Sequence, residues 1–255
     1  MNKLNTIINL NEVNKTFDNG TVAVQGMNID VSNGQFISFL GPSGCGKSTV
    51  LKMIAGLLKP TSGNIIFNGK SFSSQSQDQE IGYVFQDATL MPWATVSDNV
   101  FLPLRIKGIS KSKASNEIEK VLMQVGLKDF YNAYPRELSG GMKMRVSIAR
   151  ALIMKPKLLL MDEPFAALDE MTRFKLNDDV LTFWGNGDLT VIFVTHSVFE
   201  SVYLSNRVVV MAPRPGRVIA DISLNNNYPR SKEYRTTTNY AKNCRLISKY
   251  LQNTI

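Results

Sequence analysis

A glycine-rich segment that follows an apolar run carries the residue types needed to hold the phosphates of a nucleotide. Residues 41–49 read Gly-Pro-Ser-Gly-Cys-Gly-Lys-Ser-Thr and come directly after the apolar run 36–40. Glycines leave the backbone N–H groups of such a loop free to face an anion. The pattern predicts that Lys47 meets the β- and γ-phosphates, that the Ser48 hydroxyl ligates Mg²⁺, and that a helix begins here with its positive dipole end toward the anion. The predicted phosphate-binding residues are Gly41, Pro42, Ser43, Gly44, Cys45, Gly46, Lys47, Ser48 and Thr49.

A second apolar run ends in two adjacent carboxylates. Residues 158–161 read Leu-Leu-Leu-Met and are followed by Asp162 and Glu163. A buried parallel strand delivers such residues to the carboxyl edge of its sheet. We expect Asp162 to hold Mg²⁺ opposite Ser48 and Glu163 to polarise an attacking water, because phosphoryl transfer asks the protein mainly for positioning and charge stabilisation.

A third motif, Leu-Ser-Gly-Gly-Met at residues 138–142, precedes apolar residues at helix spacing. Ser139 suits the cap of that helix, and Gly140 and Gly141 leave its first N–H groups free to face a γ-phosphate. With this motif the chain resembles the ATP-binding subunit of an ABC transporter, whose signature loop reads Leu-Ser-Gly-Gly-Gln in most members. Met142 departs from the usual glutamine, while the serine and the glycines keep their places.

The resemblance implies further roles for single residues. In that family the signature loop contacts the ATP of the other subunit, which implies two ATP molecules in a head-to-tail homodimer. It places His196 at the γ-phosphate, Gln86 at the Mg²⁺ and the water, and Asp169 in a loop that crosses the dimer interface. Phe17 stands where an aromatic ring stacks on adenine, with a place in the core as the alternative. The resulting catalytic residues are Glu163, His196 and Gln86, and the resulting Mg²⁺ ligands are Ser48, Gln86 and Asp162.

Two further stretches favour a narrower group. Residues 90–100 and 213–219 resemble importers of nitrate, sulfonates, taurine and related small solutes, and Met142 also occurs there. The expected function is ATP hydrolysis that powers import of such a small, anionic or taurine-like solute. The expected partners are transmembrane permease subunits and an extracytoplasmic substrate-binding protein, and the expected location is the cytoplasmic face of the membrane. An exporter subunit and a soluble non-transport ABC ATPase are the alternatives, although the interval from Thr49 to Leu138 is too short for the coiled coil of DNA-repair members.

Composition is consistent with this assignment. The 255 residues suffice for one full core. No apolar run approaches the ~18–20 residues that span a bilayer, so the membrane-spanning part is expected in another subunit. Two cysteines, Cys45 and Cys244, suit a reducing cytoplasm, and Cys45 at a helix start beside Lys47 is expected to be a reactive thiolate. The net charge of +8 is not clustered enough to indicate nucleic acid, which leaves a solvated surface or, alternatively, contact with lipid headgroups.

The expected fold class is α/β. Strands 7–10 and 22–31, joined by the turn signal at 18–20, form an amino-terminal antiparallel layer, and short strands follow at 65–67 and 81–85. The resemblance implies a P-loop NTPase core with a mostly parallel sheet, in agreement with the strand–helix alternation up to residue 211. We predict one domain, 1–255, with a core at 1–86 and 155–223, an inserted helical subdomain at 87–154, and a tail at 224–255 with a linker at 225–229 and a helix at 240–251.

Overall fold

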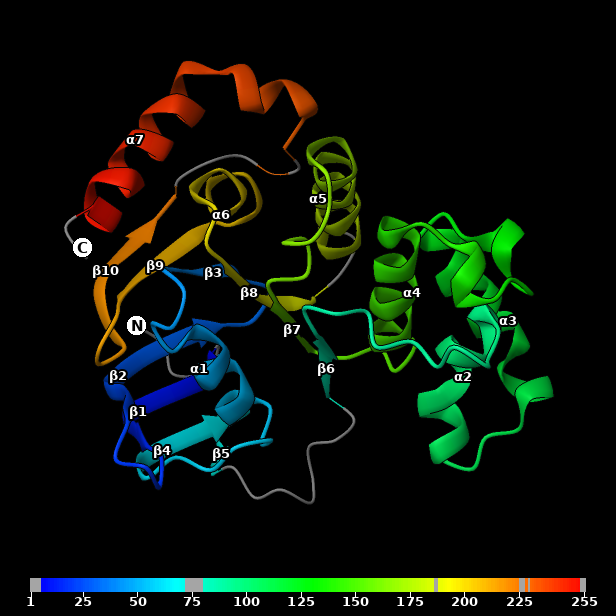
Figure 1. The fold of residues 1–255 in the computed structure, drawn as a ribbon, viewed down its shortest axis with the longest axis horizontal. Helices are drawn as coiled ribbons and strands as arrows, with labels where there is room; N and C mark the ends of the chain where they lie inside the picture. The colour runs from blue at the N-terminus through cyan, green and yellow to red at the C-terminus, as the bar shows by residue number, and fades with distance from the viewer. Residues whose placement is uncertain (1–5, 72–79, 186–187, 225–227, 229, 253–255) are drawn as a thin grey trace.

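The structure, a computed structural model, describes residues 6–71, 80–185, 188–224, 228 and 230–252 (Figure 1). It contains a four-stranded sheet in the order β2-β1-β4-β5 and a six-stranded sheet in the order β10-β9-β3-β8-β7-β6. The predicted α/β class, with an amino-terminal antiparallel sheet, a mostly parallel sheet and an inserted group of helices, is confirmed. No helix in the described part of the chain is both long enough and apolar enough to cross a membrane.

The smaller sheet is antiparallel and comes mainly from the start of the chain. β1 (Thr6–Thr16) pairs with β2 (Val22–Ser32) and with β4 (Ser62–Phe67), and the short β5 (Lys70–Ser71) pairs with β4. A tight turn joins β1 to β2, with the N–H of Gly20 donating to the carbonyl of Phe17 at 2.9 Å. The buried residues of this sheet pack on one face of α1 (Lys47–Ile54).

The larger sheet is built from buried parallel strands. β3 (Phe36–Leu40) lies between β8 (Thr190–Thr195) and β9 (Arg207–Ala212), and β7 (Leu158–Asp162) lies between β8 and β6 (Ile81–Val84). Only β10 (Arg217–Ser223), at the edge, is antiparallel to its neighbour. Every residue of β3, β7 and β8 is buried, which explains why these strands are continuous apolar runs in the sequence.

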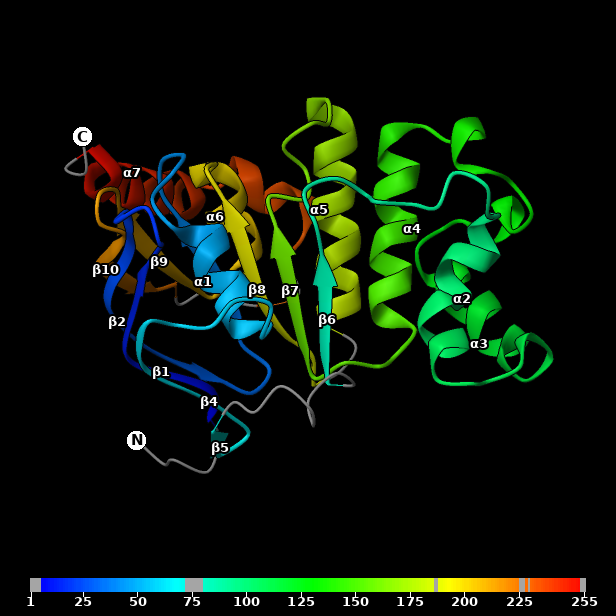
Figure 2. The same ribbon diagram turned by 60° about the horizontal axis from the view of Figure 1, so that its bottom comes forward.

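The two faces of this sheet are covered by different helices. On one face, α1 separates it from the antiparallel sheet. On the other face lie α5 (Glu170–Gly185) and α6 (Val198–Leu204), which join β7 to β8 and β8 to β9. Figure 2 shows β6, β7 and β8 side by side with their arrows in the same direction.

Three helices inserted between β6 and β7 stand to one side of the sheet (Figures 1 and 2). They are α2 (Val96–Ile106), α3 (Lys111–Gln124) and α4 (Gly140–Leu152), with short 3₁₀ turns at Lys128–Phe130 and Pro135–Glu137. The expectation of helix from residue 87 onward is wrong for 87–94. The Asn99 amide ties this stretch into a loop, because its oxygen accepts from the N–H of Met91 at 2.8 Å and its nitrogen donates to the carbonyls of Met91, Ala94 and Thr95.

The tail packs against α5 and α6. It contains a 3₁₀ turn at Lys232–Thr236 and α7 (Thr238–Gln252), which confirms the predicted helix. The predicted linker at 225–229 lies outside the described residues except for Tyr228, and the proposed domain boundaries stay predictions. The Tyr240 hydroxyl donates to the carbonyl of Phe199 at 3.1 Å, at the start of α6.

A buried guanidinium holds the other end of α6. Arg230 donates to the carbonyls of Val202, Tyr203 and Ser205, and its guanidinium lies 4.3 Å from the centroid of the Tyr228 ring. Burial lowers the pKa of this arginine from its ordinary value. The cation thus satisfies carbonyls at a helix carboxyl end, where helices leave acceptors unpaired.

We predict that Arg230→Ala lowers the free energy of unfolding by roughly 2–4 kcal/mol, because it leaves buried carbonyls without donors and removes a ring contact. Urea unfolding followed by tryptophan fluorescence measures this loss, because the ring centroid of Trp184 lies 4.7 Å from that of Tyr228 while the other tryptophan, Trp93, is already exposed in the folded chain. The exposed Arg245 of α7 is the control, and Arg245→Ala is expected to unfold as the wild type does. Equal midpoints for Arg230→Ala and the wild type would contradict the proposed clamp.

Candidate functional site

Three strands of the larger sheet end side by side and bring the predicted motifs together. Leu40, the last residue of β3, pairs with Thr195 of β8, and Asp162 of β7 pairs with Val194 of β8. The glycine-rich loop follows β3, the acid pair ends β7, and His196 follows β8. The parallel register therefore places all three at the carboxyl edge of the sheet, where such folds bind ligands.

The glycine-rich loop needs its glycines for two separate reasons. Gly44 and Gly46 have φ angles of 77° and 87°, in the left-handed region that favours glycine. Gly41 has an ordinary φ, but a Cβ on it would lie 2.6 Å from both the Cys45 sulfur and the carbonyl oxygen of Met211. The turn geometry thus requires the later glycines, and packing on β9 requires the first.

A glycine from the loop between β9 and β10 packs against the glycine-rich loop. The N–H of Gly216 donates to the carbonyl of Ala23 at 3.1 Å, and its own carbonyl accepts from Gln25 at 2.9 Å. A Cβ on Gly216 would press against the carbonyl oxygen of Cys45 and would lie 2.6 Å from that of Ala23. The resemblance to importers marks this segment in the sequence without indicating this support, and the Pro-Arg-Pro-Gly run at 213–216 is the available signal for a turn.

The ammonium group of Lys47 lies over the loop and reaches the acid pair. This side chain is buried, and its nitrogen donates to the carbonyls of Gly41 at 2.9 Å and Pro42 at 3.0 Å. It also lies 3.5 Å from a carboxylate oxygen of Glu163. The structure therefore places a positive charge between the glycine-rich loop and the predicted general base.

Asp162 is held between two hydroxyl groups. Ser48 donates to its Oδ1 at 2.7 Å, and Tyr83 of β6 donates to its Oδ2 at 3.2 Å. Burial and the nearby carboxylate raise the pKa of Tyr83 far above its ordinary value, so the phenol stays protonated and keeps donating. Tyr83 was missed from the sequence, because nothing local reveals that β6 pairs with β7.

Glu163 has a strained backbone conformation, and its carboxylate lies between Lys47 and His196. Its φ is 46°, in a region that non-glycine residues rarely adopt, while its N–H still donates to the carbonyl of Val194 at 3.0 Å. Its Oε2 lies 3.1 Å from Nδ1 of His196, whose side chain is half exposed. The contacts Lys47–Glu163–His196 thus form one continuous group at the edge of the sheet.

The oxygen atoms of Ser48 and Asp162 fit a magnesium ion. Mg²⁺ prefers oxygen ligands and is usually held by one or two carboxylates together with phosphates of the substrate. Among the described residues no group of three or more histidine, cysteine, aspartate or glutamate side chains is arranged as an all-protein metal site. The donor set therefore suits a cation that arrives with a nucleotide.

Gln86 lies in the exposed loop after β6, and none of the hydrogen bonds in the described part of the chain joins it to Ser48 or Asp162. Its predicted role stays a prediction. The loop is nevertheless held, because Arg150 of α4 donates to the carbonyls of Ala88 and Thr89, each at 2.9 Å. Sequence reasoning did not find this link between the Gln86 segment and the helix of the third motif.

The third motif begins α4 as expected and lies away from the glycine-rich loop. Oγ of Ser139 accepts from the N–H of Met142 at 3.3 Å, so the predicted helix cap is confirmed. Ser139 and Gly140 are exposed, whereas a Cβ on Gly141 would collide with the side chain of Thr172 on α5. Figures 1 and 2 both show α4 and α1 apart, with β7 between them.

Two other predicted residues lie at the surface. Asp169 is exposed and caps α5, with its Oδ1 accepting from the N–H of Thr172 at 2.9 Å. Hydrogen bonds from the side chain and the backbone of Thr172 lower the pKa of the Asp169 carboxyl. Phe17 is 39% exposed at the turn after β1, with the Lys15 nitrogen 5.4 Å from its ring centroid. The alternative place for Phe17 in the core is therefore excluded.

The expectation of a reactive thiolate at Cys45 is wrong. This side chain is fully buried in the core around α1, and burial raises the pKa of the thiol, although the ammonium of Lys47 at 3.8 Å acts in the opposite direction. The backbone of Cys45 belongs to the glycine-rich loop, but its sulfur is buried in the core. The sequence pattern places the residue and does not tell which way its side chain turns.

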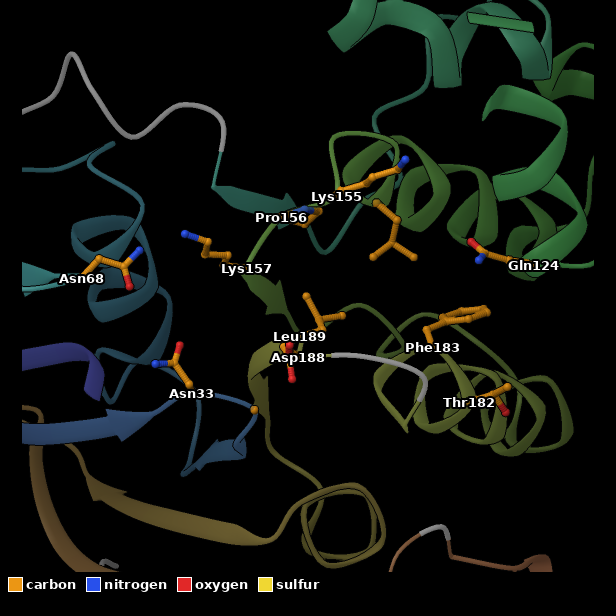
Figure 3. A pocket seen from close by; sticks show the side chains of 12 residues that line it. Asn33, Asn68, Gln124, Lys155, Pro156, Lys157, Thr182, Phe183, Asp188 and Leu189 are labelled. Carbon is orange, nitrogen blue, oxygen red and sulfur yellow. The ribbon is translucent and has the colours of Figure 1, made fainter. Parts of the chain in front are cut away.

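A cavity of about 1060 Å³ lies at the opposite, amino-terminal edge of the larger sheet (Figure 3). Lys155 and Lys157 line it and are paired with Glu117 at 3.2 Å and Glu80 at 2.8 Å. It contains none of the predicted site residues. This cavity is therefore separate from the group of predicted site residues at the carboxyl edge.

Comparison with known proteins is consistent with this geometry. A model of the ABC transporter family matches residues 24–166. An aliphatic sulfonates import ATP-binding protein from Bacillus thuringiensis subsp. konkukian is 42% identical over 228 residues, which are 88% of this chain and 89% of that protein. An uncharacterized ABC transporter ATP-binding protein from Methanocaldococcus jannaschii is 46% identical over 224 residues, which are 88% of this chain and 83% of that protein.

Two solved structures have a fold similar to that of this chain. One is cbiO1 from Clostridium perfringens, part of the ABC transporter complex cbiONQ, with a TM-score of 0.80 and 28% identity over 98% of this chain and 100% of that one. The other is a dimeric ATP-binding cassette in a post-hydrolysis state bound to ADP and Pi, with a TM-score of 0.76 and 32% identity over 87% of this chain and 100% of that one.

We predict that Gly216→Ala weakens nucleotide binding about 10-fold, because the new methyl group displaces the backbone of Cys45 at a typical overpacking cost of ~1–3 kcal/mol. Titration with a fluorescent ATP analogue measures the affinity. Gly185→Ala is the matched control, since a Cβ on Gly185 meets nothing within 4 Å. Unchanged affinity in Gly216→Ala would contradict the proposal that close packing of Gly216 on the Cys45 backbone is needed for nucleotide binding.

Proposed function

This chain belongs to the family of ABC transporter ATP-binding proteins and is an ATPase, and we propose that it powers a membrane importer of small anionic or taurine-like solutes. The relative named for aliphatic sulfonate import supports the solute class. The stretches 90–100 and 213–219, which resemble the same group of importers, support it from the sequence.

The observation that carries the proposed catalytic roles is the group Lys47–Glu163–His196 beside the pair Ser48–Asp162. In our proposal Lys47 binds the β- and γ-phosphates, Ser48 and Asp162 hold Mg²⁺, and Gln86 completes the ion's surroundings. The bound ion supplies neutralisation of the phosphate charge. Glu163 accepts a proton from the attacking water, and His196, held by Glu163, meets the γ-phosphate.

We propose that each catalytic site is completed by a second copy of the chain. Ser139 and Gly140 are exposed at the start of α4, which stands apart from α1 in Figure 2. Asp169 is also exposed, and a Cβ on Gly140 would lie 3.3 Å from the side chain of its neighbour Leu168. A head-to-tail homodimer lets Ser139, Gly140 and Gly141 of one copy close on the ATP held by the other. The dimeric state of a similar cassette with ADP and Pi supports this arrangement.

We further propose that the inserted helices carry the contact with a transmembrane permease. Trp93 and Ile106 are 77% and 78% exposed, and both lie in the stretch that follows Gln86. Large apolar side chains exposed in one segment are candidates for a contact with another protein. In this proposal the protein sits at the cytoplasmic face of the membrane, and a substrate-binding protein on the other side delivers the solute.

We predict that Glu163→Gln keeps ATP binding but slows hydrolysis ~10²–10⁴-fold, because only the general base is lost. Trapped ATP then holds two subunits together, so the variant is expected to elute from a sizing column as a dimer with MgATP and as a monomer without it. Adding Ser139→Arg is expected to abolish this dimer, because the cation blocks closure on the partner's nucleotide.

The control is Ser112→Arg in the Glu163→Gln background, which adds the same side chain on the exposed face of α3. This control is expected to keep the dimer. A Glu163→Gln variant that stays monomeric at saturating MgATP, or a Ser139→Arg variant that still dimerises, would refute the shared site and favour an ATPase that acts alone.

A further inference from the structure

Glu200 is a buried carboxylate that the proposed chemistry does not use. It lies in the first turn of α6 and is 8% exposed. One oxygen accepts a hydrogen bond from the hydroxyl of Thr195, and the other lies 3.6 Å from Nε of Arg173. Burial raises the pKa of this carboxyl, against the effect of both partners. A buried charge is costly unless it is paired, so the free-energy cost of burying Glu200 must be offset by its contacts.

The contacts of Glu200 close the backbone turn that carries His196. The hydroxyl of Thr195 donates to Glu200 and accepts from the N–H of Ser197 at 3.0 Å. The hydroxyl of Ser197 accepts from the N–H of Glu200 at 3.3 Å. Thr195, before His196, is therefore anchored to the carboxylate of Glu200. Ser197, after it, is anchored to the backbone N–H of Glu200 and to the hydroxyl of Thr195, while the imidazole itself reaches Glu163.

Arg173 connects the same carboxylate to the exposed segment before α5. Its Nη2 donates to the carbonyl of Leu168 at 2.9 Å, and its own N–H donates to the carbonyl of Asp169 at 2.9 Å. Within the described part of the chain, its Nε is buried without a hydrogen-bond partner and faces Glu200. A short movement of residues 168–169 toward α6 would turn the 3.6 Å approach into a hydrogen bond.

We propose that Arg173 and Glu200 are positioning residues: Glu200 holds the His196 turn against Glu163, and Arg173 transmits the position of Asp169 to that turn. Contact of a second copy with Asp169 thereby sets the place of His196 in the site. The inference rests on the proposed roles of His196 and of the homodimer. It adds a physical path of two side chains between the subunit interface and the reacting group.

The alternative is an ion pair that only stabilises the fold. The two accounts differ in what they do to His196. A structural pair changes the free energy of unfolding and leaves the folded site unaltered. A positioning pair changes the surroundings of the imidazole and the turnover number in protein that is still folded.

The sole histidine of the chain makes the first measurement direct. In protein prepared without a histidine tag, the imidazole Cε1–H group gives a single NMR signal, which belongs to His196. We predict that Glu200→Ala and Arg173→Ala each shift or broaden this signal in the folded free subunit. Glu200→Gln, which keeps an oxygen for Thr195, is expected to give a smaller change and covers the case in which Glu200→Ala does not fold. Glu233→Gln, at an exposed glutamate of the tail, is the control and is expected to leave the signal in place.

Kinetics supply the second readout. We predict that Glu200→Ala lowers kcat about 10- to 100-fold with little change in ATP affinity, because a small misplacement of a catalytic group costs rate and not binding. Glu200→Gln is expected to recover part of the loss. The double variant Arg173→Ala, Glu200→Ala is expected to be no slower than the slower single variant, because both substitutions break one path.

An unchanged histidine signal in all the folded variants, or kinetic losses that multiply in the double variant, would overturn the positioning role. These outcomes are distinct from failure of the proposed shared site, which shows as a Glu163→Gln protein that does not dimerise with MgATP. The NMR measurement uses the free subunit and holds whether or not that dimer forms.

Discussion

The candidate site depends on one constraint, the parallel register of three fully buried strands. Every residue of β3, β7 and β8 is buried. A shift in the register of one of these strands would therefore expose apolar side chains or bury polar ones. Their pairing makes Leu40, Asp162 and Thr195 end at the same edge. Polar residues that follow these ends are thereby brought together although Ser48 and Asp162 lie 114 residues apart in the chain and Glu163 and His196 lie 33 apart.

The electrostatics of the site follow from that convergence. A buried ammonium needs partners, and Lys47 finds two loop carbonyls and the carboxylate of Glu163. Glu163 in turn is placed by a backbone conformation with φ 46°, which keeps its N–H paired to β8 while its carboxylate turns toward Lys47 and His196. Strain of this kind persists only where the surrounding structure imposes it, and it concentrates at functional sites. The same edge carries Asp162 between two hydroxyls, poised with Ser48 for a cation.

The features that could be predicted from the sequence are local in the chain. The glycine-rich loop, the acid pair and the cap at Ser139 each depend on residues within a few positions of one another, and the continuous apolar runs indicate buried parallel strands. What could not be predicted depends on pairing and side-chain direction. Tyr83 reaches Asp162 only because β6 adjoins β7, and Gly216 packs against the glycine-rich loop only because the loop after β9 returns to β2. Cys45 shows the limit most clearly, since its backbone lies in the loop and its sulfur lies in the core.

The central claim is that Lys47 brings the positive charge that binds and activates the nucleotide phosphates at this edge. Steady-state release of phosphate from MgATP tests it most directly in Lys47→Ala, with Lys52→Ala as control, because Lys52 is an exposed lysine on the same helix. The account predicts that Lys47→Ala abolishes turnover while Lys52→Ala hydrolyses ATP at the wild-type rate. Wild-type turnover in Lys47→Ala would contradict it.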